Sequence, residues 1–310
     1  MLWQDKPYHS LDYFYKHKFH TKIAKLAIDA GFTCPNRDGS ISRGGCIFCS
    51  SRGSGDFAGS PLVSVTEQLE LQKNQIAAKW PSAKYIAYFQ AFTNTYASED
   101  QCRAKYEQAL HVKDVVGLSI ATRPDCIPPN IMALLQEINQ KTYLSVELGL
   151  QTSNEKTAAI INRGYQNACF EKALYQLTDA GIDIVAHVII GLPGETKEDV
   201  LKTAQYLSFL PIQGVKLHLL HVLKDTPLEQ WYSTGKCKTL EKEEYIHILI
   251  SALEILRPDI VIHRLTGDGA KNSLIAPIWS LNKRDVLNSI QKEMRQSKTW
   301  QGKYWTKRFV

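Results

Sequence analysis

The feature that most constrains the fold of this 310-residue chain is a regular alternation of strand-like and helix-like segments over residues 22–222. Short runs rich in β-branched and aromatic residues predict strands at 22–28, 84–90, 115–121, 142–150, 183–192 and 214–222. Amphipathic stretches between them predict helices at 65–80, 98–111, 129–140, parts of 153–180, and 196–210. This order predicts a parallel sheet with helices outside, either as an open sheet or as a partial or complete (β/α) barrel.

Polar or glycine-rich segments follow five consecutive predicted strands. A cysteine-containing loop follows the first, and the next four are followed by QAFTNTY, TRPD, ELGLQTSN and GLPGET. Ligands of parallel α/β folds bind at the C-terminal ends of the strands. The sequence therefore predicts one composite site at that end of the sheet.

Three cysteines, Cys34, Cys46 and Cys49, lie in the stretch TCPNRDGSISRGGCIFCS after the first strand. Zinc sites usually have four protein ligands, and disulfides join cysteines in pairs. Three thiolates fit a [4Fe–4S] cluster whose fourth iron keeps an open position for a substrate or cofactor. A zinc site remains the alternative, completed by His9, His17 or His20.

The remaining composition is that of an ordinary globular protein, with 44% hydrophobic and 22% charged residues. A core of this size needs no metal for stability, so a metal site would serve chemistry. The N-terminus lacks the pattern of a signal peptide, and the longest apolar run is shorter than the roughly 20 residues that span a bilayer. We therefore expect a cytoplasmic protein with reduced thiols, including the dispersed Cys102, Cys126, Cys169 and Cys237.

The pattern changes after about residue 235, which suggests a barrel over 1–235 and a C-terminal extension over 236–310. The extension contains a predicted helix at 239–256 and a basic, aromatic segment at 282–308. Together with the formal net charge of +6, this segment is compatible with an anionic partner such as RNA, or with a packed helix and tail.

Several motifs together are similar to those of the radical S-adenosylmethionine (SAM) superfamily. The spacing C-x11-C-x2-C differs from the C-x3-C-x2-C of most members. It resembles a subgroup, the YtqA/YhcC family (MnmL-type), which is akin to the elongator-catalytic-subunit type. The motifs that carry this resemblance are DAGFTCPNRDG…GGCIFCS, YFQAFTNTY, ATRPDC, ELGLQT, INRGY, HVIIGLPGET, RLTGDG and WSLNKRDVLN.

The resemblance implies a partial, TIM-like (β/α)6 barrel with a mainly helical C-terminal extension. It also implies a [4Fe–4S] cluster held by Cys34, Cys46 and Cys49, with SAM chelated at the open iron. One electron, from a donor of the reduced flavodoxin or ferredoxin type, then cleaves SAM into methionine and a 5′-deoxyadenosyl radical. The protein supplies position and exclusion of water.

The resemblance also implies SAM contacts at the ends of the strands. Phe48 would shield the cluster and pack near adenine. Gln90 and Ala91 stand where relatives have a Gly-Gly-Glu-like segment that receives the amino group, although this chain has FQAFTNT there. Thr122 and Gln151 match positions that meet the methionine and ribose parts.

Two further side chains and a turn complete the implied SAM site. Arg163, in INRGY, would pair with the SAM carboxylate, because a guanidinium suits bidentate recognition. His187 would face the ribose. Gly191, Pro193 and Gly194 would form a turn that lets the backbone approach adenine.

The implied substrate is tRNA. Close relatives are linked to the wobble uridine, at the step from 5-carboxymethylaminomethyl-uridine to 5-aminomethyl-uridine. Two alternatives remain open, a radical SAM enzyme that acts on a small metabolite and a zinc-stabilised RNA-binding protein.

Overall fold

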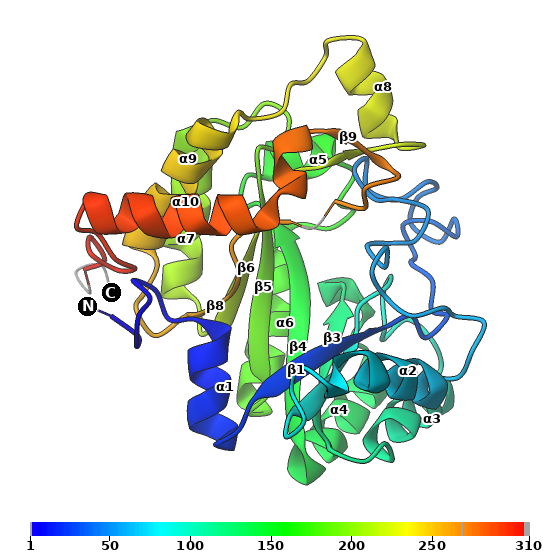
Figure 1. Ribbon diagram of the computed structural model, residues 1–310. Coiled ribbons are helices and arrows are strands. Elements are labelled where there is room, and N and C mark those ends of the chain that lie inside the picture. The colour runs from blue at the N-terminus through cyan, green and yellow to red at the C-terminus, as the bar shows by residue number, and fades with distance from the viewer. Residues whose placement is uncertain (1, 268, 307–310) are drawn as a thin grey trace.

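A curled, all-parallel sheet of seven strands forms the centre of the computed structural model, which describes residues 2–267 and 269–306 (Figure 1). The strands follow one another in chain order, so each pairs with the next. The strands are β1 (Ile23–Ile28), β2 (Lys84–Phe89), β3 (Val115–Thr122), β4 (Tyr143–Gln151), β5 (Asp183–Ile190), β6 (Gly214–Leu219) and β8 (Val261–Arg264). The predicted partial barrel is therefore confirmed.

The number of strands differs from the prediction, because β8 adds a seventh to the expected six. This strand pairs with β6 over only a few residues, with a register shift. It is too short to show a clear period-2 pattern, and His263 and Arg264 make up half of it. Its place in the sheet is set by tertiary pairing rather than by local sequence.

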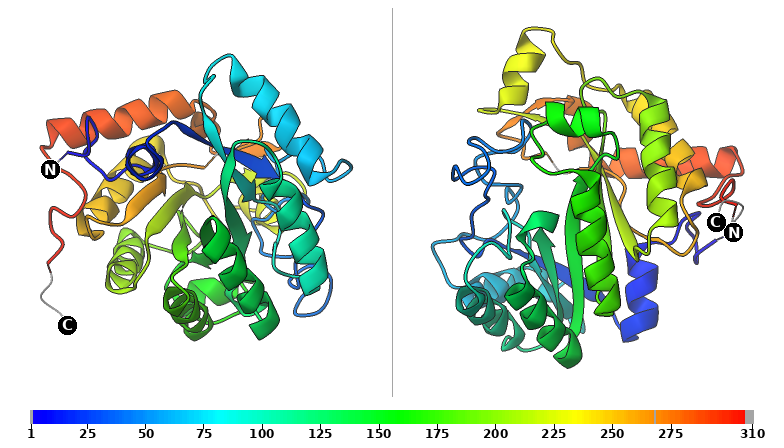
Figure 2. Two further views of the ribbon diagram at one scale, coloured as in Figure 1. Left: turned by 90° about the horizontal axis from the view of Figure 1, so that it is seen from below. Right: turned by 180° about the vertical axis from the view of Figure 1, so that it is seen from behind.

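Helices cover the outer face of the curled sheet, as the view from below shows (Figure 2). The predicted helical region 153–180 is divided into a short and a long helix. The helices between successive strands are α2 (Val65–Ala77), α3 (Glu99–Leu110), α4 (Pro129–Lys141), α5 (Glu155–Ile160), α6 (Asn167–Asp179) and α7 (Lys197–Phe209). A 3-10 turn lies at Pro124–Cys126, between β3 and α4. Residues Thr196 and Asp199 form the predicted capping box of α7.

The two faces of the strands differ in polarity. Side chains that point outward are apolar and pack against the helices in one core, for example Leu118, Val146, Ile184 and Leu217. Inward positions along the same strands carry many polar residues, which are described with the site below. A complete TIM barrel fills its interior with bulky apolar side chains. Here the alternation instead makes the inside of the half barrel a polar chamber.

The chain outside the barrel closes the gap between the edge strands β1 and β8. Helix α1 (Leu11–Phe19), which the sequence did not predict, packs against both of them. Just before it, the amide of Ile262 in β8 donates to the carbonyl oxygen of His9 at 2.7 Å. The N-terminal segment thus covers the open side near the N-terminal ends of the strands.

The C-terminal segment packs on the barrel through helices. Helix α9 (Lys242–Ile255) lies against α7, and α10 (Lys283–Gln296) lies against α9. Near the C-terminal ends of the strands, β7 (Val222–Leu223) and β9 (Leu274–Ala276) form a two-stranded antiparallel sheet. Helix α8 (Pro227–Ser233) packs against β7, and a 3-10 turn at Ile278–Leu281 follows β9. The barrel and extension boundary near residue 235 stays a prediction, although the extension contributes β8 to the sheet.

No helix in the described part of the chain is both long and apolar enough to span a membrane.

Candidate active site

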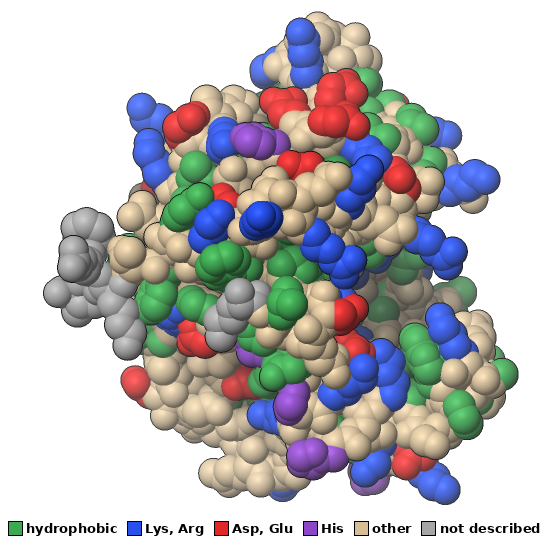
Figure 3. Space-filling view, turned by 60° about the vertical axis from the view of Figure 1, so that its left-hand side comes forward, with side chains coloured by type: hydrophobic (Ala, Val, Ile, Leu, Met, Phe, Trp, Pro, Cys, Tyr) green, Lys and Arg blue, Asp and Glu red, His purple; other side chains and the backbone are tan. Residues whose placement is uncertain are grey.

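A cavity lies at the C-terminal ends of the strands, between the cysteine loop and the inside of the half barrel. Side chains from β2 to β6 and β8 line it, and so do Cys34, Cys46 and Cys49. A hollow is visible towards the right of the face in Figure 3, with Lys and Arg side chains around it. The predicted composite site is therefore one continuous space, and the three thiols share it.

The cysteine loop is held by hydrogen bonds to a turn more than 100 residues later in the chain. The Asn36 side chain donates to the carbonyl oxygen of Asn162 at 2.6 Å, and the Asn162 side chain donates to that of Gly45 at 2.8 Å. Within the loop, Arg37 Nη2 donates to the carbonyl oxygen of Cys49 at 2.8 Å. Gly45 has a φ of +82°, and a Cβ there would lie 2.9 Å from Arg37 Nε, so this position requires glycine.

An apolar cluster supports the loop from below. Ile47 is buried between the second and third cysteines, and Phe48 packs on the same cluster while also lining the cavity. Other members of the cluster come from the end of α5, from the ends of β5 and β6, and from β7 and α8, among them Ile161, Ile189, Leu192, Leu220, Val222 and Leu228. The loop is thus fixed by both polar and apolar contacts.

The three thiols form a donor set that fits an iron–sulfur cluster. All three are free cysteines, and no other cysteine is among the described residues that line the cavity. Burial raises the pKa of Cys46 to about 12, and burial also raises that of Cys49 although Arg37 opposes it. The metal-free thiols of Cys46 and Cys49 are therefore protonated at neutral pH, and metal binding must displace these protons.

The histidines that could complete a zinc site, His9, His17 and His20, lie away from the three thiols. His17 and His20 are in or next to α1, which precedes β1, whereas the cysteine loop follows the other end of that strand. His9 Nδ1 lies 3.1 Å from the carbonyl oxygen of Asp259. Among the described residues, no group of three or more His, Cys, Asp or Glu side chains is placed to hold a metal ion. In a cubane cluster the three thiolates bind three different irons, so they need not converge on one point as zinc ligands must.

Five of the predicted SAM contacts line the cavity, namely Phe48, Gln90, Thr122, Gln151 and His187. Gln90 Nε2 also donates to the carbonyl oxygen of Ser54 at 2.6 Å, which ties the end of β2 to the cysteine loop. The structure thus brings these side chains together, and their contacts with SAM stay a prediction.

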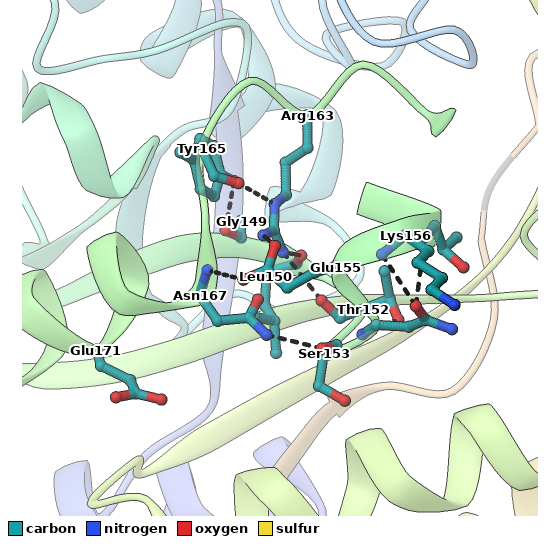
Figure 4. Close-up of polar contacts among 12 residues, drawn as sticks. Gly149, Leu150, Thr152, Ser153, Glu155, Lys156, Arg163, Tyr165, Asn167 and Glu171 are labelled. Carbon is teal, nitrogen blue, oxygen red and sulfur yellow. Dashed lines mark hydrogen bonds and ion pairs between the residues drawn. The ribbon is translucent and has the colours of Figure 1, made fainter. Parts of the chain in front are cut away.

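Arg163 does not reach the cavity, in contrast to the predicted pairing with the SAM carboxylate. Its side chain is 1% exposed. Its Nη1 donates to the carbonyl oxygens of Leu150 at 2.8 Å and Thr152 at 3.0 Å, and its Nε donates to that of Tyr165 at 2.9 Å (Figure 4). An ion pair with Glu155 at 3.1 Å engages Nη2. These bonds engage all three guanidinium nitrogens. Arg163 is therefore a positioning residue that connects the end of β4 to the turn at 161–165.

Ala91 is also outside the cavity lining. It is 1% exposed, and a Cβ on Gly55 would lie 2.6 Å from the Ala91 methyl, so it packs beneath the cysteine loop. Its neighbours Gln90 and Phe92 do line the cavity. Gly191 and Gly194 both have a positive φ, and a Cβ on Gly191 would lie 3.1 Å from Leu240; the approach of this turn to adenine stays a prediction.

A buried charge network that the sequence analysis did not identify lies at the cavity floor. Glu147, in β4, is ion-paired through Oε1 with Lys25 at 2.5 Å and through Oε2 with Lys216. Its two oxygens also accept from Ser119 Oγ at 2.8 Å and contact His187 Nε2 at 2.7 Å. These residues alternate with apolar ones along their strands, and this inward period-2 pattern was the signal that could have identified them.

The charges of the network are coupled. Burial alone would raise the pKa of Glu147, but Lys216 and Lys25 hold it well below its usual range. Burial lowers the pKa of Lys216 to about 7, although Glu147 opposes this. Burial, together with the charge of Lys216, lowers the pKa of His187 to about 4, so His187 is neutral at pH 7 and serves as a hydrogen-bond donor to Glu147.

We predict that Arg163→Lys destabilises the protein by about 1–3 kcal/mol, because one ammonium cannot replace the bonds that the guanidinium makes to several carbonyl oxygens. Chemical denaturation of the metal-free protein measures this. Arg103→Lys, on the outer surface of α3, is the matched control and should change stability by less than about 0.5 kcal/mol. Unchanged stability together with weakened SAM binding would instead return Arg163 to the predicted carboxylate contact.

Comparison with known proteins matches most of the chain, including the cysteine loop, to one enzyme superfamily. Residues 34–207 match the model of the radical SAM superfamily, and residues 212–296 match the radical SAM C-terminal domain. The chain is 46% identical to YtqA of Bacillus subtilis (strain 168) over 301 residues, which cover 97% of this chain and 94% of the relative. It is 36% identical to YhcC of Escherichia coli (strain K12) over 270 residues, which cover 86% of this chain and 85% of the relative.

A solved structure shares the fold. The archaeal Methanocaldococcus infernus Elp3 with an N-terminal deletion has a TM-score of 0.68 at 17% identity, over 91% of this chain and 64% of that one. The extent of the family match and the identity to YtqA show that this chain belongs to the radical SAM superfamily, whose members bind a [4Fe–4S] cluster and S-adenosylmethionine.

Proposed function

We propose that this radical SAM enzyme modifies the wobble uridine of tRNA, at the step from 5-carboxymethylaminomethyl-uridine to 5-aminomethyl-uridine. The observation that carries the enzymatic part is that Cys34, Cys46 and Cys49 line the same cavity as a polar, charged floor. The tRNA part is supported by more distant relatives. One is the tRNA uridine(34) acetyltransferase of Dehalococcoides mccartyi (strain CBDB1), 27% identical over 55% of this chain and 37% of that protein.

On this proposal, Cys34, Cys46 and Cys49 hold the cluster, which when bound supplies the electron that cleaves SAM. The chain's own residues position the reactants and exclude water. Phe48 and the apolar cluster beneath the loop cover one side of the site. Gln90, Thr122, Gln151 and His187 line the wall on which SAM would lie. Hydrogen bonds from the turn at 161–165 keep the loop in place.

The C-terminal segment supplies a surface that is compatible with RNA. Helix α10, which lies against α9, buries Val286, Ile290 and Met294 in the main apolar core. Its other face carries exposed basic side chains, including Lys292 and Arg295. The following segment places Lys303 over the rings of Trp300 and Tyr304, and Tyr304 is 61% exposed. Exposed cations beside aromatic rings can bind both phosphates and bases.

The first prediction from the proposed function concerns the iron–sulfur cluster. Anaerobically reconstituted protein should contain about four irons and four sulfides per chain, the content of one cubane cluster. Replacing Cys34, Cys46 or Cys49 by Ala should abolish the cluster and SAM cleavage, whereas Cys169→Ala, in α6, should retain both. Iron and sulfide analysis with detection of 5′-deoxyadenosine measures the outcome. Stoichiometric zinc without sulfide would favour the zinc-stabilised RNA-binding alternative.

The second prediction concerns the substrate. In a strain that lacks this protein, tRNA should accumulate 5-carboxymethylaminomethyl-uridine and lose the nucleosides made from 5-aminomethyl-uridine. Mass spectrometry of tRNA nucleosides detects both changes. Restoring the wild-type gene should reverse them, and restoring the Cys34→Ala variant should not. An unchanged nucleoside profile in an active SAM-cleaving enzyme would favour a small-metabolite substrate.

The third prediction concerns the RNA surface. Replacing Lys303, Lys307 and Arg308 by Ala should weaken tRNA binding and flatten its salt dependence, by about 0.9 in the log–log slope for each lost phosphate contact. The last two residues lie outside the described part of the chain. Uncoupled SAM cleavage should remain, because the cysteines line a separate cavity. Equal tRNA affinity and salt slope in the wild type and the variant would place the RNA surface elsewhere.

A further inference from the structure

The cavity carries positive charge at two separate places. At the cysteine end, Arg37 is bonded to the cysteine loop, and Arg123 forms an ion pair with Asp125 at 2.6 Å. These two arginines lie beside the thiols, where a cluster with three thiolates adds negative charge. The second positive region is the floor, where Lys25 and Lys216 contact Glu147.

The floor has more basic than acidic side chains among the described residues. Lys25 and Lys216 share one carboxylate, and each oxygen of Glu147 already has two partners. Lys216 is 5% exposed, and its Nζ donates to Tyr88 Oη at 2.9 Å as well as to Glu147. Arg264, the Cα partner of Lys216 on β8, lines the same cavity. A buried surplus cation is costly unless an anion joins it.

One imidazole nitrogen next to this charge has no hydrogen-bond partner among the described residues. The Nε2 atom of His218 is buried, and no hydrogen-bond partner for it is found within the described residues. The ring lies 5.2 Å from that of His187, centroid to centroid, and His218 lines the cavity. Burial lowers the pKa of His218 well below its usual value, so the ring is neutral. An unpaired buried nitrogen beside a cavity marks a place where a ligand atom could bond.

The position of this floor suits a group at the end of a substrate. Gly149, His187 and Lys216 are Cα partners in one row across β4, β5 and β6. Gly149 precedes Gln151, the last residue of β4, by two positions, which corresponds to about 7 Å along a strand. A short chain that extends from a base at the strand ends can therefore reach Lys216.

We propose that the cavity floor binds a carboxylate of the substrate, with Lys216 as its ionic partner and His218 as a hydrogen-bond donor. The net positive charge suits a monoanion, and Glu147 disfavours a phosphate dianion at the same place. The proposal rests on the proposed function for the identity of this carboxylate, which would be the carboxymethyl group of the modified uridine. The new element is the pair Lys216 and His218, which would distinguish the substrate, with its carboxymethyl group, from the product, which lacks this group.

Calorimetry on anaerobically reconstituted, SAM-loaded protein without reductant tests the proposal. The probes are the nucleoside 5-carboxymethylaminomethyl-uridine and its carboxamide, which has nearly the same shape but lacks the carboxylate charge. Wild-type protein should bind the carboxylate about tenfold or more tightly than the amide, the scale of a charge-assisted hydrogen bond. Lys216→Met should remove this preference and His218→Phe should reduce it, while iron content and SAM affinity persist. Lys202→Met, on the outside of α7, should behave as wild type.

A second pair of probes separates this proposal from the proposed function. N-benzylglycine and N-benzylglycinamide carry the same charged and neutral ends without the uridine. If the protein prefers N-benzylglycine over N-benzylglycinamide but does not bind the nucleoside, the carboxylate site is supported and the wobble-uridine function is contradicted. If SAM-loaded wild type shows no preference for the charged member of either pair, the proposal is overturned, whatever tRNA analysis gives. If Lys216→Met loses iron, the wild-type preference and His218→Phe decide the outcome.

Discussion

The inside of the half barrel depends on one buried carboxylate, that of Glu147. It meets Lys25 from β1 and Lys216 from β6, strands that are five positions apart in the sheet. In a flat sheet these strands would be about 24 Å apart, at about 4.8 Å per spacing. The two ammonium groups can reach one carboxylate only because the sheet curls. The network therefore crosslinks the curled form, and removing Glu147 would leave two buried cations without their partner.

The cysteine loop depends in turn on the end of β4. Arg163 binds carbonyl oxygens at that end and fixes the turn at 161–165, whose Asn162 then holds the loop. The network at the floor and this chain of contacts both originate in β4, a central strand of the sheet. One strand thus supports the floor of the cavity and, through the turn, its cysteine wall. These contacts hold the three thiols at the cavity that opens into the inside of the barrel.

Sequence alone predicted a parallel α/β sheet and the cysteine loop because both have local signals, in strand periodicity and in cysteine spacing, and the family resemblance implied the partial barrel. It did not predict β8 at 261–264, since four residues carry too little pattern and their pairing is a tertiary effect. The family resemblance assigned Arg163 to the SAM carboxylate, because a guanidinium can bind a carboxylate or backbone carbonyl oxygens, and only its burial distinguishes the two. The alternation along their strands marks Lys25, Glu147 and Lys216 as inward-facing, but their meeting at one carboxylate could be seen only after the strands were curled.

The distance in sequence between the cysteine loop and its anchors fixes the order in which the site matures. The hydrogen bonds from Asn36 to Asn162 and from Asn162 to Gly45 span 126 and 117 residues. During synthesis the thiols therefore leave the ribosome long before the turn that positions them exists. The loop acquires its shape only when β4 and the following turn have joined the sheet. We therefore expect iron–sulfur loading to be a late step that uses a finished scaffold, unlike a zinc finger, in which the metal itself drives folding.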